Sequence, residues 1–185
     1  MKTIGYLGLG VMGYGMTSNL IQKSGGPVYG YDPVPEARAR FAANGGVALE
    51  SAEELYRTCD IICECLPTNE IVRATVTDIM NAARPGTIIV DMGSTSPYII
   101  QELHAQAKEK DIHLLDSPVS GGKTGADAGT LVIMCGGDPE TFEAVRPYLE
   151  MMGKTVTYMG PSGCGSAAKV ANNMMVGIHL VAMGE

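Results

Sequence analysis

The sequence predicts an α/β protein in which helices cover both faces of a mostly parallel β-sheet. Three observations predict this class. Short β-rich runs alternate with helical patterns, the connections between them are short, and the 185 residues include 24 glycines, which suit tight strand-to-helix turns. A composition of 45% hydrophobic and 18% charged residues fits a globular domain and excludes a disordered chain.

Strand and helix patterns follow one another along most of the chain. The predicted strands are residues 3–7, 28–31, 61–66, 87–91, 113–116, 131–135 and 155–158. The predicted helices are residues 12–22, 36–43, 52–57, 71–83, 97–110 and 139–151. Strands separated by single helices build a doubly wound sheet.

Proline and glycine mark several of these boundaries. Ser96 and Asp138 each precede a proline, so each is expected to be the N-cap of a helix with proline in its first turn. Residues 84–86 (Arg-Pro-Gly) end one helix and turn into the next strand.

The last segment has a different pattern. Residues 160–165 are rich in glycine, and residues 166–185 form a helical pattern with apolar residues on most of its surface. A helix that is apolar nearly all round is normally buried. We therefore expect a dinucleotide-binding domain at 1–163 and, at 164–185, the first part of a long interdomain helix of an all-helical domain that follows residue 185.

A glycine loop follows the first strand directly. Residues 8–13 are Gly8, Leu9, Gly10, Val11, Met12 and Gly13. In this pattern the first glycine allows the tight turn, the second lets the backbone approach a pyrophosphate, and the third lets helix pack on strand. Free N–H groups at the helix start favour the phosphates. The loop predicts a Rossmann-like dinucleotide site.

Asp32 ends the second strand, 24 residues after Gly8. An acid at this place binds the ribose hydroxyls of the adenosine and repels the additional phosphate of NADP, so the sequence favours NAD over NADP. The alternative is that Asp32 only caps the turn at Pro33. Arg38 and Arg40 are expected on the solvated side of the next helix.

Four separated segments carry a family resemblance. They are residues 8–20; residues 116–122 with 125–126 and 129–131; residues 163–165 with Lys169, Asn172 and Asn173; and the pairs Leu66-Pro67 and Ser94-Thr95. Together they resemble the β-hydroxyacid dehydrogenases, the family of 3-hydroxyisobutyrate dehydrogenase, tartronate semialdehyde reductase and 6-phosphogluconate dehydrogenase. Gly15 departs from good helix sequence, because glycine costs roughly 1 kcal/mol relative to alanine within a helix, and the sequence offers no reason for it.

The resemblance implies roles for individual residues. Lys169 alone would be taken for a surface lysine, but its alanine and valine neighbours and the family motif make it the catalytic base. Asn173, four residues on, is the preferred hydrogen-bond partner of substrate or lysine, with Asn172 in a supporting position. Two sets complete the site: Ser120, Gly121 and Gly122 for the substrate carboxylate, and Leu66, Pro67 and Thr95 beside the cofactor.

The predicted function is hydride transfer between NAD and a small β-hydroxy acid or its semialdehyde or keto form. The partners expected are a small carboxylate substrate and further copies of the chain. A formal charge of −7 argues against nucleic acid and anionic membranes. The five cysteines show neither disulfide nor metal-site spacing, so we expect no metal and a cytoplasmic location.

The sequence lacks the patterns of other dehydrogenase classes. Short-chain dehydrogenases require a tyrosine four residues before a lysine, zinc alcohol dehydrogenases require metal ligands, and this chain has neither pattern. Imine reductases share the architecture but are expected to replace the lysine. The alternative left open is a non-catalytic dinucleotide-binding or sensing module.

Overall fold

The fold is that of a computed structural model, which describes residues 2–184. The strands are β1 (Ile4–Leu7), β2 (Val28–Tyr31), β3 (Val47–Ala48), β4 (Ile61–Glu64), β5 (Ile88–Asp91), β6 (His113–Asp116), β7 (Val119–Ser120), β8 (Leu131–Gly136) and β9 (Gly153–Gly160). The helices are α1 (Val11–Lys23), α2 (Pro35–Ala43), α3 (Ala52–Thr58), α4 (Asn69–Ala82), α5 (Pro97–Glu109), α6 (Gly122–Ala128), α7 (Pro139–Met152) and α8 (Cys164–Gly184).

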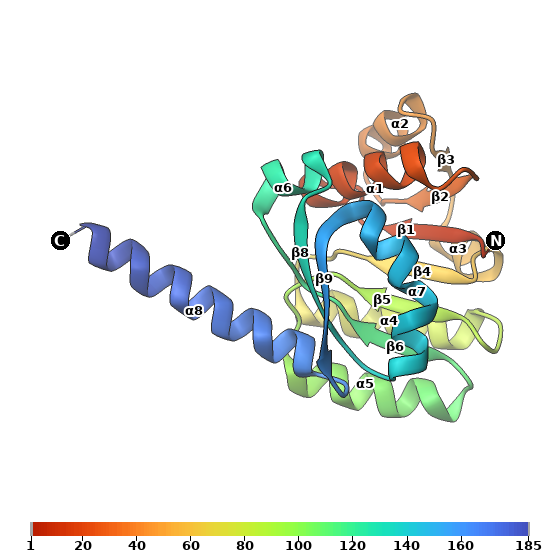
Figure 1. Ribbon diagram of the computed structural model, residues 1–185. Coiled ribbons are helices and arrows are strands. Elements are labelled where there is room, and N and C mark those ends of the chain that lie inside the picture. The colour runs from red at the N-terminus through yellow and green to blue at the C-terminus, as the bar shows by residue number, and fades with distance from the viewer. Residues whose placement is uncertain (1, 185) are drawn as a thin grey trace.

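Within residues 2–184 the strands form one sheet (Figure 1). Its order is β3-β2-β1-β4-β5-β6-β8-β7, and β9 pairs with β8. All strands from β3 to β6 pair in parallel, while β8 runs antiparallel to β6 and β7 and parallel to β9. The predicted α/β class with a doubly wound, mostly parallel sheet is confirmed.

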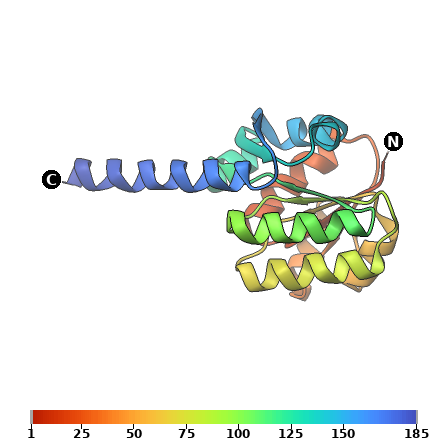
Figure 2. The same cartoon turned by 90° about the horizontal axis from the view of Figure 1, so that it is seen from below.

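Both faces of the sheet are covered by helices (Figure 2). Alternate residues of each central strand enter two separate cores: in β5, Val90 packs toward α1, α6 and α7, whereas Ile89 packs toward α3, α4 and α5. A strand that is buried on both faces has no polar side. The sequences of the central strands are therefore continuous apolar runs rather than alternating patterns.

Three short elements were missed by the sequence analysis. β3 and β7 have two residues each, too few for a periodic pattern, and the glycine-rich stretch after Ser120 forms a seven-residue helix, α6, rather than a plain turn. The starts of α5 and α7 at Pro97 and Pro139 fit the prediction. The side chains of Ser96 and Asp138, however, make no capping hydrogen bond.

The final helix leaves the body of the protein after its first turns (Figures 1 and 2). Its apolar residues from 170 onward are 49% to 77% exposed: Val170, Met174, Met175, Val176, Ile178, Leu180, Val181 and Met183. The burial of this surface between two domains stays a prediction. Within residues 2–184, none of the helices combines the length and the apolarity that a membrane span requires.

Candidate active site

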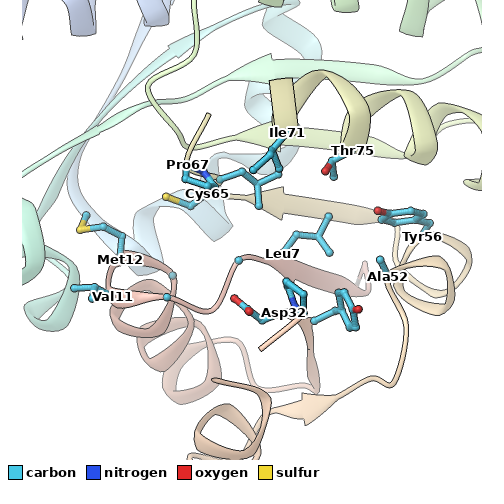
Figure 3. Close-up of a pocket in the computed structure, with 16 residues that line it drawn as sticks. Leu7, Val11, Met12, Asp32, Ala52, Tyr56, Cys65, Pro67, Ile71 and Thr75 are labelled. Carbon is cyan, nitrogen blue, oxygen red and sulfur yellow. The ribbon is translucent and has the colours of Figure 1, made fainter. Parts of the chain in front are cut away.

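The strand order reverses between β1 and β4, and a cavity lies at the carboxyl ends of these strands. It has a volume of about 650 Å³ and is lined by the loops after β1, β2 and β4 together with α3 and α4. Figure 3 shows Val11 and Asp32 on one side of this cavity and Pro67 and Ile71 across it. Open α/β sheets bind their ligands at such a switch point.

The glycine loop takes the conformation that the motif predicts. Gly8 has a φ of +85°, in the left-handed region that favours glycine. A Cβ on Gly13 would lie 1.8 Å from the carbonyl oxygen of Gly8, so this position excludes every larger residue. A Cβ on Gly10 would meet nothing within 4 Å, which leaves the backbone there open to a ligand.

The start of α1 offers the donors that an anion requires. Gly10 is the N-cap, and no side chain caps the helix. The first N–H groups of a helix have no partner within the helix, and the helix dipole adds positive potential at that end. The loop therefore fits a pyrophosphate.

Asp32 lines the same cavity and is 8% exposed. One carboxylate oxygen accepts a hydrogen bond from the N–H of Leu9 at 2.8 Å, and the other accepts from the N–H of Val34 at 2.9 Å. Asp32 thus makes the turn that the alternative reading expected. Each carboxylate oxygen can accept a second hydrogen bond, so the turn leaves acceptor capacity for ribose hydroxyls.

Arg40 is exposed, as expected for the solvated side of α2, whereas Arg38 is only partly exposed. Arg38 donates to the carbonyl of Asp32 at 2.7 Å, and Arg40 donates to the carbonyl of Leu9 at 2.9 Å. The guanidinium of Arg40 also stacks on the ring of Tyr14, 4.6 Å from its centroid. Both arginines brace the loops that bound the cavity.

A second cavity of about 530 Å³ continues from the first, sharing the loop after β4 and Met12 with it. Residues far apart in sequence meet here: Thr95 after β5, Gly122 at the start of α6 and Lys169 on α8. Leu66 and Pro67 line both cavities. The predicted catalytic lysine and the predicted cofactor residues thus share one continuous groove.

Lys169 is half-buried in this second cavity, and burial lowers the pKa of its ammonium below the ordinary value. Its helix is fixed to the sheet by Asp116 at the end of β6. The carboxylate of Asp116 accepts hydrogen bonds from the N–H groups of Gly163 at 2.9 Å and Ser166 at 2.7 Å. The contact is close enough that a Cβ on Gly165 would lie 2.3 Å from the carbonyl oxygen of Met134.

The loop at residues 120–122 meets α8 through Asn172 rather than Asn173. The amide of Asn172 donates to the hydroxyl of Ser120 at 3.3 Å. Asn173, which the sequence analysis preferred, is exposed and does not line the second cavity. Gly121 and Gly122 both have positive φ, 131° and 58°, and Gly122 lines the cavity, whereas Ser120 and Gly121 do not.

Comparison with known proteins agrees with this geometry. Residues 3–160 match the family described as the NAD binding domain of 6-phosphogluconate dehydrogenase. The chain belongs to this family. The predicted kinship with the β-hydroxyacid dehydrogenases and the prediction of NAD as cofactor are thereby confirmed.

Individual relatives of this family resemble the whole chain. A probable 3-hydroxyisobutyrate dehydrogenase of Mycobacterium tuberculosis is 43% identical over 185 residues, which are 100% of this chain and 63% of that protein. An NAD-dependent L-serine dehydrogenase of Pseudomonas aeruginosa is 36% identical over 188 residues, covering 100% and 63%. The solved structure of the Mycobacterium tuberculosis 3-hydroxyisobutyrate dehydrogenase with L-serine superposes with a TM-score of 0.94 over 98% of this chain and 62% of that one. This chain therefore spans less than two thirds of these relatives.

Within this NAD-binding fold, three acids end neighbouring strands: Glu64 on β4, Asp91 on β5 and Asp116 on β6, in register. All three are fully buried. Burial raises the pKa of Asp91 to about 6, opposed by hydrogen bonds from Thr95 and the N–H of Gly93. Asp91 holds the turn after β5, and Asp116 holds the start of α8.

Glu64 was not singled out by the sequence analysis. Both of its oxygens are buried without a partner among the described residues, and burial raises its pKa well above the ordinary value. The available indication was a single acid inside the apolar run of residues 61–66. Tyr31 and Tyr56, which line the first cavity, also escaped notice because their strand and helix patterns do not show which face they occupy.

Proposed function

We propose that the protein is an NAD-dependent oxidoreductase that transfers a hydride between the cofactor and a small β-hydroxy acid or its semialdehyde or keto form. The observation that carries this proposal is the placement of Lys169, a half-buried lysine, in a cavity continuous with the NAD groove. The relatives named as 3-hydroxyisobutyrate and L-serine dehydrogenases support the substrate class.

Oxidation of a hydroxy acid requires a hydride acceptor and a base for the hydroxyl proton. Bound NAD supplies the acceptor. The Nζ of Lys169 takes the proton in oxidation and returns it in reduction. Burial lowers the pKa of Lys169, which raises the neutral, proton-accepting fraction at a given pH and so favours general-base catalysis.

Ser120, Gly121 and Gly122 bind the substrate carboxylate in this proposal. Backbone N–H groups at the start of α6 provide donors, and the hydroxyl of Ser120 provides one more. Because the hydroxyl of Ser120 accepts from Asn172, its own hydrogen is free to point toward the substrate. Asn173 stays our candidate for a hydrogen bond to substrate or lysine once a substrate is bound.

The proposal extends to the organisation of the whole protein. We infer that residues 1–163 are the dinucleotide-binding domain and that residues 164–185 begin the interdomain helix of an all-helical domain. The exposed apolar surface of α8 from Val170 onward supports this division. Homo-oligomers would cover further apolar surface, and five free cysteines fit a reducing, cytoplasmic compartment.

The test is hydride transfer itself. NADH formation is followed at 340 nm with a panel of short β-hydroxy acids, L-serine included, and the corresponding alcohols without a carboxylate serve as matched controls. We expect turnover with at least one acid and none with the alcohols. NAD binding without turnover of any acid, in protein that includes every residue of the native chain, would favour the alternative of a non-catalytic dinucleotide-binding module.

A further inference from the structure

Helix α6 packs against α1, the helix that follows the glycine loop (Figure 1). The link is Asn19, which is 6% exposed. Its amide nitrogen lies 2.9 Å from the carbonyl oxygen of Ala126, 3.3 Å from that of Asp127 and 3.0 Å from that of Gly15. An amide has two N–H groups, so one serves α1 itself and the other serves the end of α6.

Asn19 gives these carbonyls a donor from outside α6, in addition to the N–H of Gly129, which bonds to the carbonyl of Ala126 at 3.4 Å. The last carbonyl groups of a helix have no partner within the helix, and Ala126 and Asp127 lie in the final turn of α6. Asn19 is therefore a capping group supplied by a different helix.

Two glycines make this close contact between α1 and α6 possible. A Cβ on Gly15 would lie 2.7 Å from the Oδ1 of Asp127 and 2.9 Å from the backbone carbon of Ala126. Gly129 ends α6 with a φ of +65°, and a Cβ there would lie 2.4 Å from the Oδ1 of Asn19. The close approach explains Gly15, for which the sequence alone gave no reason.

The short helix depends on this support. α6 has seven residues, two of them glycine, and an isolated helix of that length is not stable in water. Ala126 is its one fully buried hydrophobic side chain. The end of α6 opposite to Asn19 begins at Gly121 and Gly122, next to Ser120.

We propose that Asn19 is a positioning residue for substrate: by fixing α6 to α1, it sets the place of the Ser120–Gly122 loop relative to the cofactor. The proposal rests on the proposed function for the identity of the substrate, a small carboxylate. Cofactor phosphates bind at the start of α1 and the substrate carboxylate at the start of α6, so the contact between the two helices fixes the distance between the two ligands. Misplacing reacting groups by about 1 Å can cost on the order of 10²-fold in rate.

The test compares Asn19→Leu with Asn44→Leu in the complete protein. Asn44 is a matched control because its amide also bonds to α1, donating to the hydroxyl of Ser18 at 2.9 Å, but from α2 and away from α6. We expect Asn19→Leu to raise KM for the β-hydroxy acid at least tenfold, to leave the Kd of NAD within about threefold, and to speed amide exchange at residues 125–130 at least tenfold. The control should change none of these.

Gly15→Ala provides a second route to the same contact. It keeps the donor and favours a helical α1, yet its Cβ meets the backbone of α6, so we expect the same selective rise in KM and in exchange at 125–130. Amide exchange needs no turnover, so it tests the contact even if no β-hydroxy acid is a substrate. Wild-type exchange and KM in both variants would overturn the proposal, as would a parallel loss of NAD affinity, which would make Asn19 a general support of α1.

Discussion

The two ends of the groove are built in different ways. At the glycine loop the contacts are local: Gly13 meets Gly8, and Leu9 bonds to Asp32, 23 residues away. At the Lys169 end the contacts are distant, because Asp116 bonds to Ser166 across 50 residues and Ser120 to Asn172 across 52. The glycine-loop end is thus shaped by short-range sterics, whereas the Lys169 end is assembled by the tertiary fold.

This difference predicts that the two ends can be damaged separately. The largest effect is expected at the cofactor end. In Gly13→Ala the new Cβ would lie 1.8 Å from the carbonyl oxygen of Gly8, so the loop must open, and NAD affinity should fall by about 100-fold or more, the scale of several lost backbone contacts to a charged group. Calorimetric titration with NAD measures this.

Gly26→Ala is the control for that loss, since a Cβ at Gly26 meets nothing within 4 Å. It should bind NAD as the wild type does. If Gly13→Ala also bound NAD with wild-type affinity, the glycine loop would not be the phosphate site. The claim that local contacts in this loop shape the cofactor end would then be wrong.

Asp32 tests how the same end selects its cofactor. We expect NAD to bind at least tenfold more tightly than NADP, about 1.4 kcal/mol, because a carboxylate in the cavity repels the additional phosphate. Asp32→Ala should reduce the difference in affinity between the two cofactors, chiefly by increasing the affinity for NADP. Parallel titrations decide it, and equal affinities in the wild type would contradict the role given to Asp32.

Asp116 tests the distant end. Asp116→Asn keeps the size of the side chain but replaces one acceptor of the Gly163 and Ser166 N–H groups by a donor. The start of α8 should shift, and kcat should fall by about tenfold, since small displacements of a catalytic group are costly. The Kd of NAD should stay within about twofold, because the glycine loop is untouched.

A matched control for that variant is Asp60→Asn, which alters a carboxylate just before β4, at the amino ends of the strands, that accepts from the N–H of Thr3 at 2.8 Å. It should leave kcat unchanged. Loss of NAD affinity in Asp116→Asn equal to the loss of kcat would show that the two ends are not independent.

The smallest effect concerns Glu64, the strand-end acid whose oxygens have no hydrogen-bond partner among residues 2–184. Its folded pKa is raised by burial, so its contribution to stability is full below the unfolded pKa of about 4.3 and is lost as the pH rises toward the folded pKa. Glu64→Gln removes this dependence. Urea unfolding should therefore show the variant gaining stability over the wild type between pH 5 and pH 8, by about 1 kcal/mol or more.

A constant difference between Glu64→Gln and the wild type over this pH range would show that Glu64 titrates alike in the folded and unfolded chain.

The same contrast explains how much the sequence could predict. Sheet class, glycine loop and Asp32 were predictable because they depend on periodicity and on contacts within a few tens of residues. The placement of Asn172 instead of Asn173 beside Ser120 was not, since neighbouring residues on a helix differ by rotation and only the packed sheet fixes which one faces the loop. Gly15 had no explanation in the sequence for the same reason, because the atoms that it approaches lie on a different helix, α6.

The central claim is that Lys169 transfers the proton while the cofactor is held elsewhere. Its most direct test is kcat and the Kd of NAD measured on the same preparations of wild type, Lys169→Ala and Lys169→Arg. We expect kcat to fall by about 10²-fold or more in both variants, because alanine has no base and guanidinium does not release its proton, with the Kd of NAD unchanged. Loss of NAD binding in parallel with kcat, or wild-type kcat in Lys169→Ala, would contradict the account.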